Sequence, residues 1–330
     1  MRVWYSSYQL FPKSKMGIKK VTYRLGALLR VEFESGLVGY SDLCPFQRFK
    51  DKPLEMELQN ITKNKLSSIS NRSLEFARWD AEARKEGRSL YLDEEIKNHF
   101  LITNILDFEM DRIDPLQEMG YSDFKVKLGS DLRMETEMVK SLVESFRPGT
   151  KLRLDFNGSM SRESFTKWLE ENLNSIRPSL DFIEDPFTYE PKEWGLIQNR
   201  YEIDLALDLI SDPLKDQGLG ANVIILKPAI QDTDLIASKI SDSTKRFIVT
   251  HYMDFPVGQM FGLVCAQRLA RSGEKRMKTC GLQHQDIYEG FTFQEAVTNK
   301  GPYILPPSGP GIGFEGLLEN QDWRELKRAN

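Results

Sequence analysis

The fold is decided by a short stretch that reads Phe124-Lys125-Val126-Lys127-Leu128-Gly129, and by four later stretches of the same kind. The later four are Leu152-Arg153-Leu154-Asp155-Phe156-Asn157-Gly158, Phe182-Ile183-Glu184-Asp185-Pro186, Ala206-Leu207-Asp208 and Ile225-Leu226-Lys227-Pro228. Each has an apolar run that ends in charged or amide side chains. Because side chains alternate along a strand, Lys125 and Lys127 share one face, as do Asp155 and Asn157. The pattern predicts a row of buried strands with polar side chains at their C-terminal ends.

Strands and helices alternate on both sides of these stretches. Predicted strands cover residues 102–108, 124–128, 152–156, 182–184, 205–208, 223–226, 247–250 and 277–281. Predicted helices cover residues 135–145, 163–172, 238–243, 258–270 and 285–297. A doubly wound sheet would carry a glycine-rich phosphate loop after its first strand, and none follows Phe108. The alternation therefore predicts an α/β fold with a (β/α)7β barrel at residues 101–305.

The first hundred residues show a different pattern of strands and helices. Residues 27–33 and 38–42 read as a hairpin, and residues 54–66 and 73–85 read as helices, with Ser73 as the N-cap of the second. Residues 306–330 begin with a rigid, proline- and glycine-rich exit from the barrel. We expect residues 1–100 to form an α+β capping domain on which residues 306–330 pack back.

Composition narrows the class of partner. The chain of 330 residues has 45 basic and 49 acidic side chains and a net charge of −4, which gives no electrostatic reason to bind nucleic acid or an anionic membrane. It contains no apolar run long enough to span a bilayer and no N-terminal signal pattern. Its three cysteines are odd in number and widely spaced, which is typical of structural thiols in a reducing cytoplasm. We expect a cytoplasmic protein with a small-molecule partner; the sequence leaves its oligomeric state open.

Three carboxylates would meet at the mouth of such a barrel. Asp155, Glu184 and Asp208 end three successive predicted strands, where barrel enzymes place their chemistry. Carboxylates without cysteine or histidine make a hard oxygen site that suits Mg²⁺ or Mn²⁺. Lys127 and Lys227 flank this group, and a desolvated lysine beside a divalent cation can act as a base. The set predicts proton abstraction α to a substrate carboxylate, with the cation stabilising the charge that develops.

With these motifs the chain resembles the enolase superfamily, in the subgroup of muconate-lactonizing enzyme and most of all the o-succinylbenzoate synthase family. Residues 39–45 resemble a capping-domain motif, and Pro310-Gly311-Ile312-Gly313 resembles the closing motif. The resemblance implies Mg²⁺ on Asp155, Glu184 and Asp208. It also implies that Lys127 abstracts the proton and then assists the leaving hydroxyl, while Lys227 stabilises the intermediate as a cation.

The resemblance also implies supporting roles. Lys125 and Asn157 would hydrogen-bond to the metal ligands and catalytic lysines, and Arg153 would help hold Lys127. Capping loops at residues 12–19 and 45–52 would close over the succinyl side of the substrate. The implied reaction is the dehydration of 2-succinyl-6-hydroxy-2,4-cyclohexadiene-1-carboxylate in menaquinone biosynthesis.

The chain departs from the family pattern after the third predicted metal ligand and at the seventh barrel strand. Leu209-Ile210 follow Asp208 where an acidic residue and a serine are usual, and Thr250-His251-Tyr252-Met253 replace a serine-rich sequence. We assign Thr250 and His251 to the substrate pocket. His251 is not the base that a related subgroup uses, because position 227 is lysine. His99 and His284 have no neighbours that suggest ligation and are interpreted as structural.

Two other hypotheses remain open. One is an N-acylamino acid racemase or a dipeptide epimerase of the same subgroup, which would need both lysines as acid and base. Residues 280–284 lack the Asp-x-Asp motif of dipeptide epimerases, which favours the synthase. The other is a non-catalytic barrel that only binds or scaffolds; it predicts missing ligands, yet all three carboxylates and both lysines are present.

Overall fold

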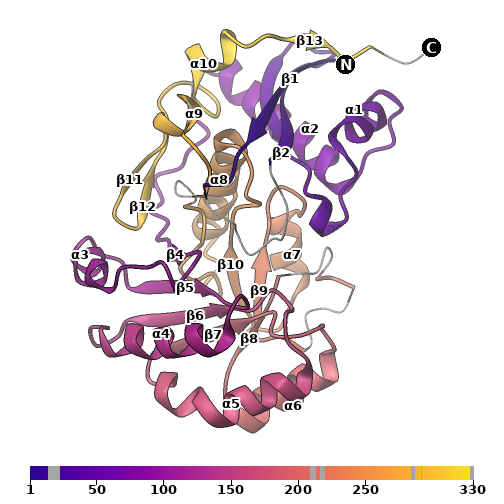
Figure 1. The fold of residues 1–330 in the computed structure, drawn as a ribbon. Coiled ribbons are helices and arrows are strands. Elements are labelled where there is room, and N and C mark those ends of the chain that lie inside the picture. Colours follow the sequence, from indigo (N-terminus) through magenta and orange to yellow (C-terminus); the bar gives the residue numbers. More distant parts are fainter. Residues whose placement is uncertain (14–22, 209–212, 216–219, 284–286, 291, 328–330) are drawn as a thin grey trace.

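The computed structural model describes residues 1–13, 23–208, 213–215, 220–283, 287–290 and 292–327. Its larger half is a sheet of parallel strands that follow one another in chain order and curl into a barrel (Figure 1). These strands are β4 (Phe100–Ile102), β5 (Asp123–Lys127), β6 (Lys151–Asp155), β7 (Leu180–Glu184), β8 (Leu205–Leu207), β9 (Val223–Leu226) and β10 (Arg246–Val249). Most of their side chains are buried, as expected for parallel strands covered on both faces.

Residues 277–281 close the ring between the first and last of these strands. Met277 and Gly281 form parallel bridges with Phe247 and Thr250 at β10, and Cys280 bridges to Asn98 just before β4. The segment therefore takes the place of an eighth strand through isolated bridges.

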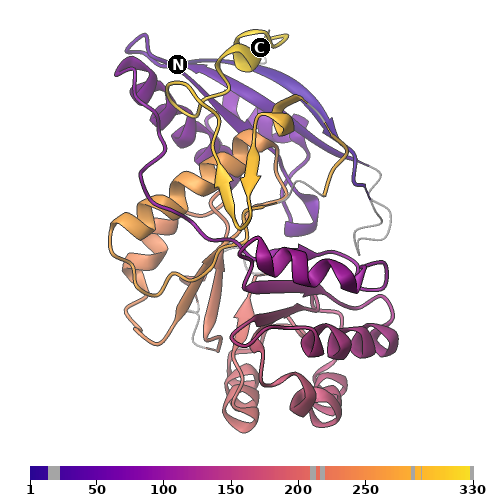
Figure 2. The ribbon, with the colours of Figure 1, turned by 90° about the vertical axis from the view of Figure 1, so that its left-hand side faces the viewer.

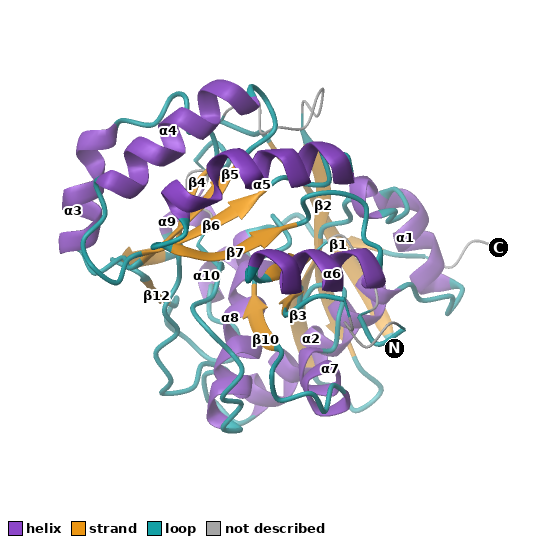
Figure 3. Cartoon of the chain, turned by 90° about the horizontal axis from the view of Figure 1, so that it is seen from below, coloured by secondary structure: helices purple, strands orange, loops and turns teal. Residues whose placement is uncertain are grey.

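Helices cover the outer side of the barrel (Figure 3). They are α3 (Ile113–Glu118), α4 (Leu132–Glu144), α5 (Arg162–Ile176), α6 (Pro191–Tyr201), α7 (Thr233–Lys239) and α8 (Pro256–Arg271), with the short η2 (Met110–Arg112) before α3. Local sequence sets their starts: the side chains of Asp131, Ser161 and Asp232 cap α4, α5 and α7. Proline occupies the first turn of α6 and α8, where its missing N–H costs nothing.

The cap is a four-stranded antiparallel sheet in the order β13-β1-β2-β3 with two helices against it. Its elements are β1 (Arg2–Leu10), β2 (Arg24–Glu32), β3 (Val38–Leu43), η1 (Gln47–Phe49), α1 (Leu54–Thr62), α2 (Ser68–Lys85) and β13 (Arg324–Glu325). Gly39 lets α2 lie directly on β3, since a Cβ there would sit 1.9 Å from the Ala77 carbonyl oxygen. Because β13 pairs with β1, the C-terminal segment completes the cap (Figure 2). The remaining elements, α9 (Thr292–Glu295), β11 (Thr298–Lys300), β12 (Tyr303–Leu305) and α10 (Glu315–Glu319), lead from barrel to cap.

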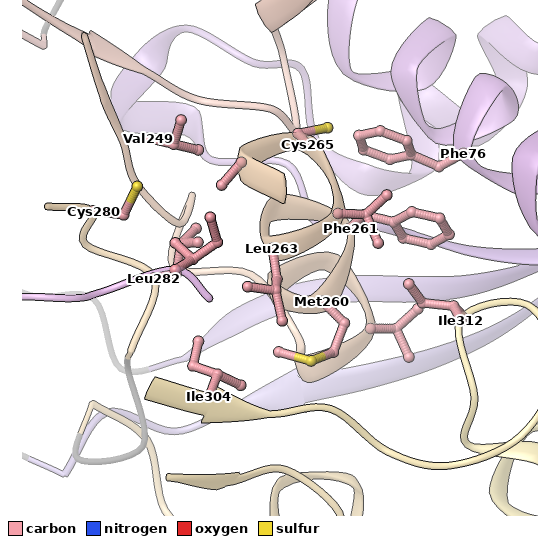
Figure 4. Packing of buried hydrophobic residues seen from close by; sticks show 14 of the residues in the cluster. Phe76, Val249, Met260, Phe261, Leu263, Cys265, Cys280, Leu282, Ile304 and Ile312 are labelled. Atoms are coloured by element: carbon pink, nitrogen blue, oxygen red, sulfur yellow. The ribbon is translucent and has the colours of Figure 1, made fainter. Parts of the chain in front are cut away.

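Helix α8 joins the two halves through a shared apolar core (Figure 4). Phe261 of α8 stacks on Phe76 of the cap helix α2, with ring centroids 4.5 Å apart and planes 7° apart. Val249 of β10 and Leu282 belong to the same buried cluster. The cap is thus held over the barrel mouth by apolar packing. Among the described residues, no helix is long and apolar enough to cross a membrane.

Several predicted elements were misplaced. The strand predicted at 102–108 lies at Phe100–Ile102, and the helix predicted at 238–243 begins earlier, at Thr233, because Asp232 caps it. Ser73 is not an N-cap: α2 begins after Ser67, whose hydroxyl accepts from the Ser70 amide in a capping box. Ser73 instead donates to the carbonyl oxygens of Ile69 and Asp42, which ties α2 to β3.

Other elements were missed or overextended. Of the helix predicted at 285–297, the described residues contain only the single turn Thr292–Glu295. No helix or strand was predicted for the residues of α6, β1 or β13. In β1 the buried positions are few and irregular, because this strand lies between β2 and the short β13 with much of its surface in solvent.

Candidate active site

A cavity of about 170 Å³ lies where the C-terminal ends of the barrel strands face the cap. Its charged wall comes from the predicted strand-end residues on β5, β6, β8 and β9. Its apolar roof comes from Phe46 and Phe49 of the cap and from Tyr252 and Met253 after β10. Their rings contact one another, with Phe49 and Tyr252 centroids 5.2 Å apart. The polar residues at the strand ends therefore face a cavity that the cap partly covers.

Lys125 connects two of the predicted metal ligands. Its Nζ lies 2.6 Å from Glu184 Oε1 and 3.0 Å from Asp155 Oδ2. Burial acts to lower the pKa of Lys125, but the charges of Asp155 and Glu184 outweigh it and raise that pKa above its ordinary value. Lys125 is therefore a permanent cation at the centre of the site, and its position on β5 follows from the alternation that the sequence shows.

Lys127 and Asn157 both bind Asp155. Lys127 Nζ donates to Asp155 Oδ2 at 3.0 Å, and Asn157 donates to Oδ1 from its side-chain amide at 2.8 Å and its backbone at 3.1 Å. Asn157 reaches this position with a left-handed backbone (φ 51°), which asparagine tolerates better than most residues. Both oxygens of Asp155 therefore accept hydrogen bonds; burial acts to raise the pKa of Asp155, but the charges of Lys125 and Lys127 outweigh it and lower that pKa.

An acidic cluster lies beside this network. Oxygen atoms of Glu184, Asp185 and Asp208 all lie within 4.8 Å of one another. Two of the three predicted ligands therefore meet directly, and Asp155 is joined to Glu184 through Lys125. Asp185 was not predicted, because strand alternation points it away from Glu184. The strand has ended at this residue (φ 40°), so alternation no longer applies there.

The cluster fits a bound cation. Glu184 Oε2 is buried and has no hydrogen-bond partner among the described residues. Burial raises the pKa of Glu184 to about 7, with the charges of Asp155 and Asp208 adding to it and Lys125 opposing it. Burial and the charge of Asp208 likewise raise the pKa of Asp185. Closely spaced carboxylates with an unused oxygen are the hard donor set of a divalent metal ion.

Lys227 lies on the other side of the cavity from Lys127, with β6, β7 and β8 between their strands. Its Nζ is 3.0 Å from Asp208 Oδ1 and donates to Thr250 Oγ1 at 3.0 Å. The side chain of Lys127 is 24% exposed and that of Lys227 is 10% exposed. The structure thus places one accessible and one tightly held ammonium group across a single cavity.

Thr250 and His251 both line the cavity, as the sequence analysis expected of pocket residues. His251 Nδ1 accepts a hydrogen bond from the Met253 amide at 2.9 Å, which fixes the turn that carries Tyr252. The cap loop at 45–52 covers the cavity through Phe46 and Phe49. The other predicted cap loop, at 12–19, lies outside the described residues except for Pro12 and Lys13.

Arg153 lies deeper in the barrel than expected. Its guanidinium bonds to Asp181 at 2.9 Å, His99 Nδ1 at 2.9 Å, the Thr279 carbonyl at 2.8 Å and Asp123 at 3.3 Å. Within the described residues, Lys127 is not among the hydrogen-bond partners of Arg153. The contacts of Arg153 therefore differ from the expectation that it holds Lys127. The same contacts bring His99, interpreted from sequence as structural, to the cavity wall. The only signal in the sequence is the alternation through β4, which places His99 on the same face as Leu101, toward the barrel interior.

A parallel barrel whose mouth carries an acidic cluster and two opposed lysines, beneath an α+β cap, defines the enolase superfamily. Residues 110–210 match the family model described as "Enolase C-terminal domain-like", and residues 3–83 match "O-succinylbenzoate synthase, N-terminal domain". The chain is 33% identical over 333 residues to the o-succinylbenzoate synthase of Bdellovibrio bacteriovorus, covering 99% of each protein. The chain belongs to the o-succinylbenzoate synthase family of the enolase superfamily.

Solved structures show the same fold at low identity. The L-Ala-D/L-Glu epimerase from Bacillus subtilis superimposes with a TM-score of 0.77 at 15% identity, over 95% of this chain and 98% of that one. The N-succinyl Arg/Lys racemase from Bacillus cereus also gives 0.77, at 14% identity over 99% of both chains. The protein is therefore an enzyme of a superfamily whose members use a divalent metal ion.

Proposed function

We propose that this protein is an o-succinylbenzoate synthase, a carbon–oxygen lyase of menaquinone biosynthesis. It would catalyse the Mg²⁺-dependent syn dehydration of 2-succinyl-6-hydroxy-2,4-cyclohexadiene-1-carboxylate to 2-succinylbenzoate. The observation that carries this proposal is the difference between the two lysines beside the acidic cluster: Lys127 is accessible, whereas Lys227 is held between Asp208 and Thr250. The full-length identity of 33% to a named synthase supports the choice of substrate.

Asp155, Glu184 and Asp208 would hold the metal ion, with Asp185 adjacent to them. When bound, Mg²⁺ would supply the positive charge that stabilises the dianionic enediolate of the substrate carboxylate. Lys125, which binds both Asp155 and Glu184, keeps these two carboxylates in place. Mn²⁺ would satisfy the same oxygen donors.

Lys127 would act as the only base. In its neutral form, the accessible Lys127 amine takes the proton from the carbon that bears the carboxylate and becomes an ammonium group. It then gives that proton to the 6-hydroxyl, which leaves as water while the ring becomes aromatic. One lysine serves both steps because the proton and the hydroxyl leave from the same face. Lys227, held between Asp208 and Thr250, remains a cation and stabilises the enediolate from the opposite side.

The roof of the cavity suits a ring substrate. Phe46, Phe49 and Tyr252 present apolar surface over the charged groups, and Tyr252 is 1% exposed. A roof of this kind excludes water and strengthens the electrostatic interactions beneath it. A small-molecule carboxylate is therefore the partner that we propose for this site.

An assay with purified protein and Mg²⁺ tests the proposal. We expect 2-succinylbenzoate to form from the cyclohexadiene carboxylate, and to form too slowly to measure when Lys127→Ala replaces the base. Turnover of N-succinylamino acids without any dehydration would contradict the proposal.

Racemisation of N-acylamino acids or epimerisation of dipeptides is the second candidate. The two lysines on opposite sides of the cavity favour it, since racemisation needs one group on each face of the intermediate. Lys227→Arg separates the two functions because arginine keeps the cation but is not a proton donor or acceptor at neutral pH. A synthase should retain part of its dehydration activity, whereas a racemase should lose its activity. An unchanged rate of either reaction would refute both roles of Lys227.

A further inference from the structure

His99 lies at the cavity wall with one ring nitrogen committed to an arginine. Its Nδ1 is 2.9 Å from Arg153 Nη1. A guanidinium can only donate, so Nδ1 must be the acceptor of this bond. The ring proton is therefore on Nε2. Arg153 cannot turn away, because Asp181 and the Thr279 carbonyl fix it at 2.9 and 2.8 Å.

The imidazole is also held in its neutral form. A charged ring would carry a proton on Nδ1 and would face the Arg153 guanidinium with a second donor. Burial, the charge of Arg153 and the charge of Lys125 lower the pKa of His99 well below its ordinary value, and the nearby charge of Asp155 offsets this only in part. His99 is 4% exposed, so little water is available to compensate. The group is a neutral Nε2–H donor.

This donor faces the cavity beside Gly281. A Cβ at Gly281 would lie 2.6 Å from His99 Nε2 and 2.4 Å from Cε1, so only glycine leaves room for the ring at this position. Both residues line the cavity. Within the part of the chain that the structure describes, Nε2 has no hydrogen-bond partner. A donor at the wall of a cavity without a protein partner is available to a ligand that supplies an oxygen.

The position of His99 around the barrel indicates which part of a bound ligand can contact it. His99 precedes β4, and Gly281 ends the segment that closes the barrel, so both lie across the ring from β7, which carries Glu184. A substrate arm that extends from the acidic cluster across the floor of the cavity, beneath the aromatic roof, reaches His99 and Gly281. We propose that His99 Nε2–H donates a hydrogen bond to a carbonyl or carboxylate oxygen on the substrate arm remote from the reacting carboxylate, and that His99 thereby selects substrates with an oxygen there. This inference rests on the proposed function.

Nitrogen NMR on the wild-type protein with Mg²⁺ tests the tautomer directly. The chain has three histidines, so the variant His99→Gln identifies the His99 signals. We expect a neutral Nε2–H ring at neutral pH. Adding 2-succinylbenzoate should shift the Hε2 resonance and slow its exchange with water. A proton on Nδ1, a charged ring, or a resonance that saturating 2-succinylbenzoate leaves unmoved would overturn the proposal.

Binding measurements separate recognition from structural support. His99→Phe removes the donor and should weaken the binding of 2-succinylbenzoate roughly tenfold or more, whereas His99→Gln, which keeps an amide donor, should lose less. Benzoate, which lacks the arm, is the matched probe and should bind all three proteins equally. Equal weakening of both ligands in His99→Phe would show a structural role only and would overturn the proposal.

The two proposals fail in different ways. If the wild-type protein turns over the cyclohexadiene carboxylate and binds 2-succinylbenzoate but the His99 signals do not move, this inference alone is wrong. If it neither forms nor binds 2-succinylbenzoate, the proposed function is wrong and this inference falls with it.

Discussion

Asp254 is a buried carboxylate at the junction of cap and barrel, and it should make folding stability depend on pH. It is 4% exposed, and its Oδ1 accepts a hydrogen bond from the Tyr252 amide at 3.2 Å. Its other oxygen faces Asp42 of β3: a Cβ on Gly258 would lie 2.7 Å from Asp254 Oδ2 and 2.6 Å from Asp42 Oδ2. Burial raises the pKa of Asp254 from 3.8 to about 6.

The sign follows from proton binding. Between the two pKa values the folded protein still holds a proton on Asp254 that the unfolded chain has lost, so the free energy of unfolding falls as pH rises from about 4 to about 6. A shift of about two pKa units corresponds to about 3 kcal/mol lost by neutral pH. Asp254→Asn carries no charge and keeps an oxygen for the Tyr252 amide. We expect this variant to be more stable than the wild type by up to about 3 kcal/mol at neutral pH and equally stable below about pH 4.

Urea unfolding followed by tryptophan fluorescence, repeated from about pH 4 to about pH 8, measures this difference. Asp322→Asn is the matched control, since the Asp322 side chain is 81% exposed and its neutralisation should leave the pH profile unchanged. Parallel profiles for Asp254→Asn and the wild type would refute the assignment of a buried, destabilising carboxylate. So would an Asp254→Asn protein that is less stable at neutral pH.

Three further predictions concern the site. Chelation of divalent cations should lower the melting temperature by a few degrees and Mg²⁺ should restore it, because the metal ion binds only the folded state. A melting temperature that changes with neither treatment would contradict a metal site. Glu184→Gln should abolish this response to Mg²⁺ and stabilise the metal-free protein at neutral pH, since burial raises the pKa of Glu184 to about 7 and its ionised form is disfavoured; thermal denaturation with and without Mg²⁺ measures both effects. Gly281→Ala should raise the KM for the substrate roughly tenfold or more, because the added methyl group collides with the His99 ring; an unchanged KM would show that the ring moves aside freely.

Much of the barrel was predictable because strand alternation and strand ends are local properties of the sequence. The predicted strand at 223–226 matches β9, and the predicted strand at 124–128 differs from β5 by one residue at each end. Lys125 and Lys127 share a face of β5, and both line the cavity. Short apolar runs bounded by turn residues favour such strands.

The parts that were missed depend on tertiary contacts. Asp185 joins the acidic cluster because the chain turns at positive φ after β7, and the alternation of side chains along a strand does not predict that turn. Arg153 was expected beside Lys127, but the buried carboxylates of Asp123 and Asp181, which are distant in sequence, attract it to a lower layer of the barrel.

The charged half of the cavity and the half that faces the substrate arm are encoded differently in the sequence. A sequence motif therefore indicates the residues of the first half but not those of the second. The charged half consists of side chains at the ends of successive strands, so its residues occur in chain order and indicate the class of reaction. The half that we propose to bind the substrate arm consists of His99, the absent side chain at Gly281 and aromatic rings from the cap, such as Phe49. None of these forms a pattern by itself, since a glycine matters here only because His99 occupies the space beside it. Substrate choice in this protein is therefore a property of the three-dimensional contacts of the cavity, which is why proton abstraction beside a carboxylate could be inferred from sequence before its substrate could.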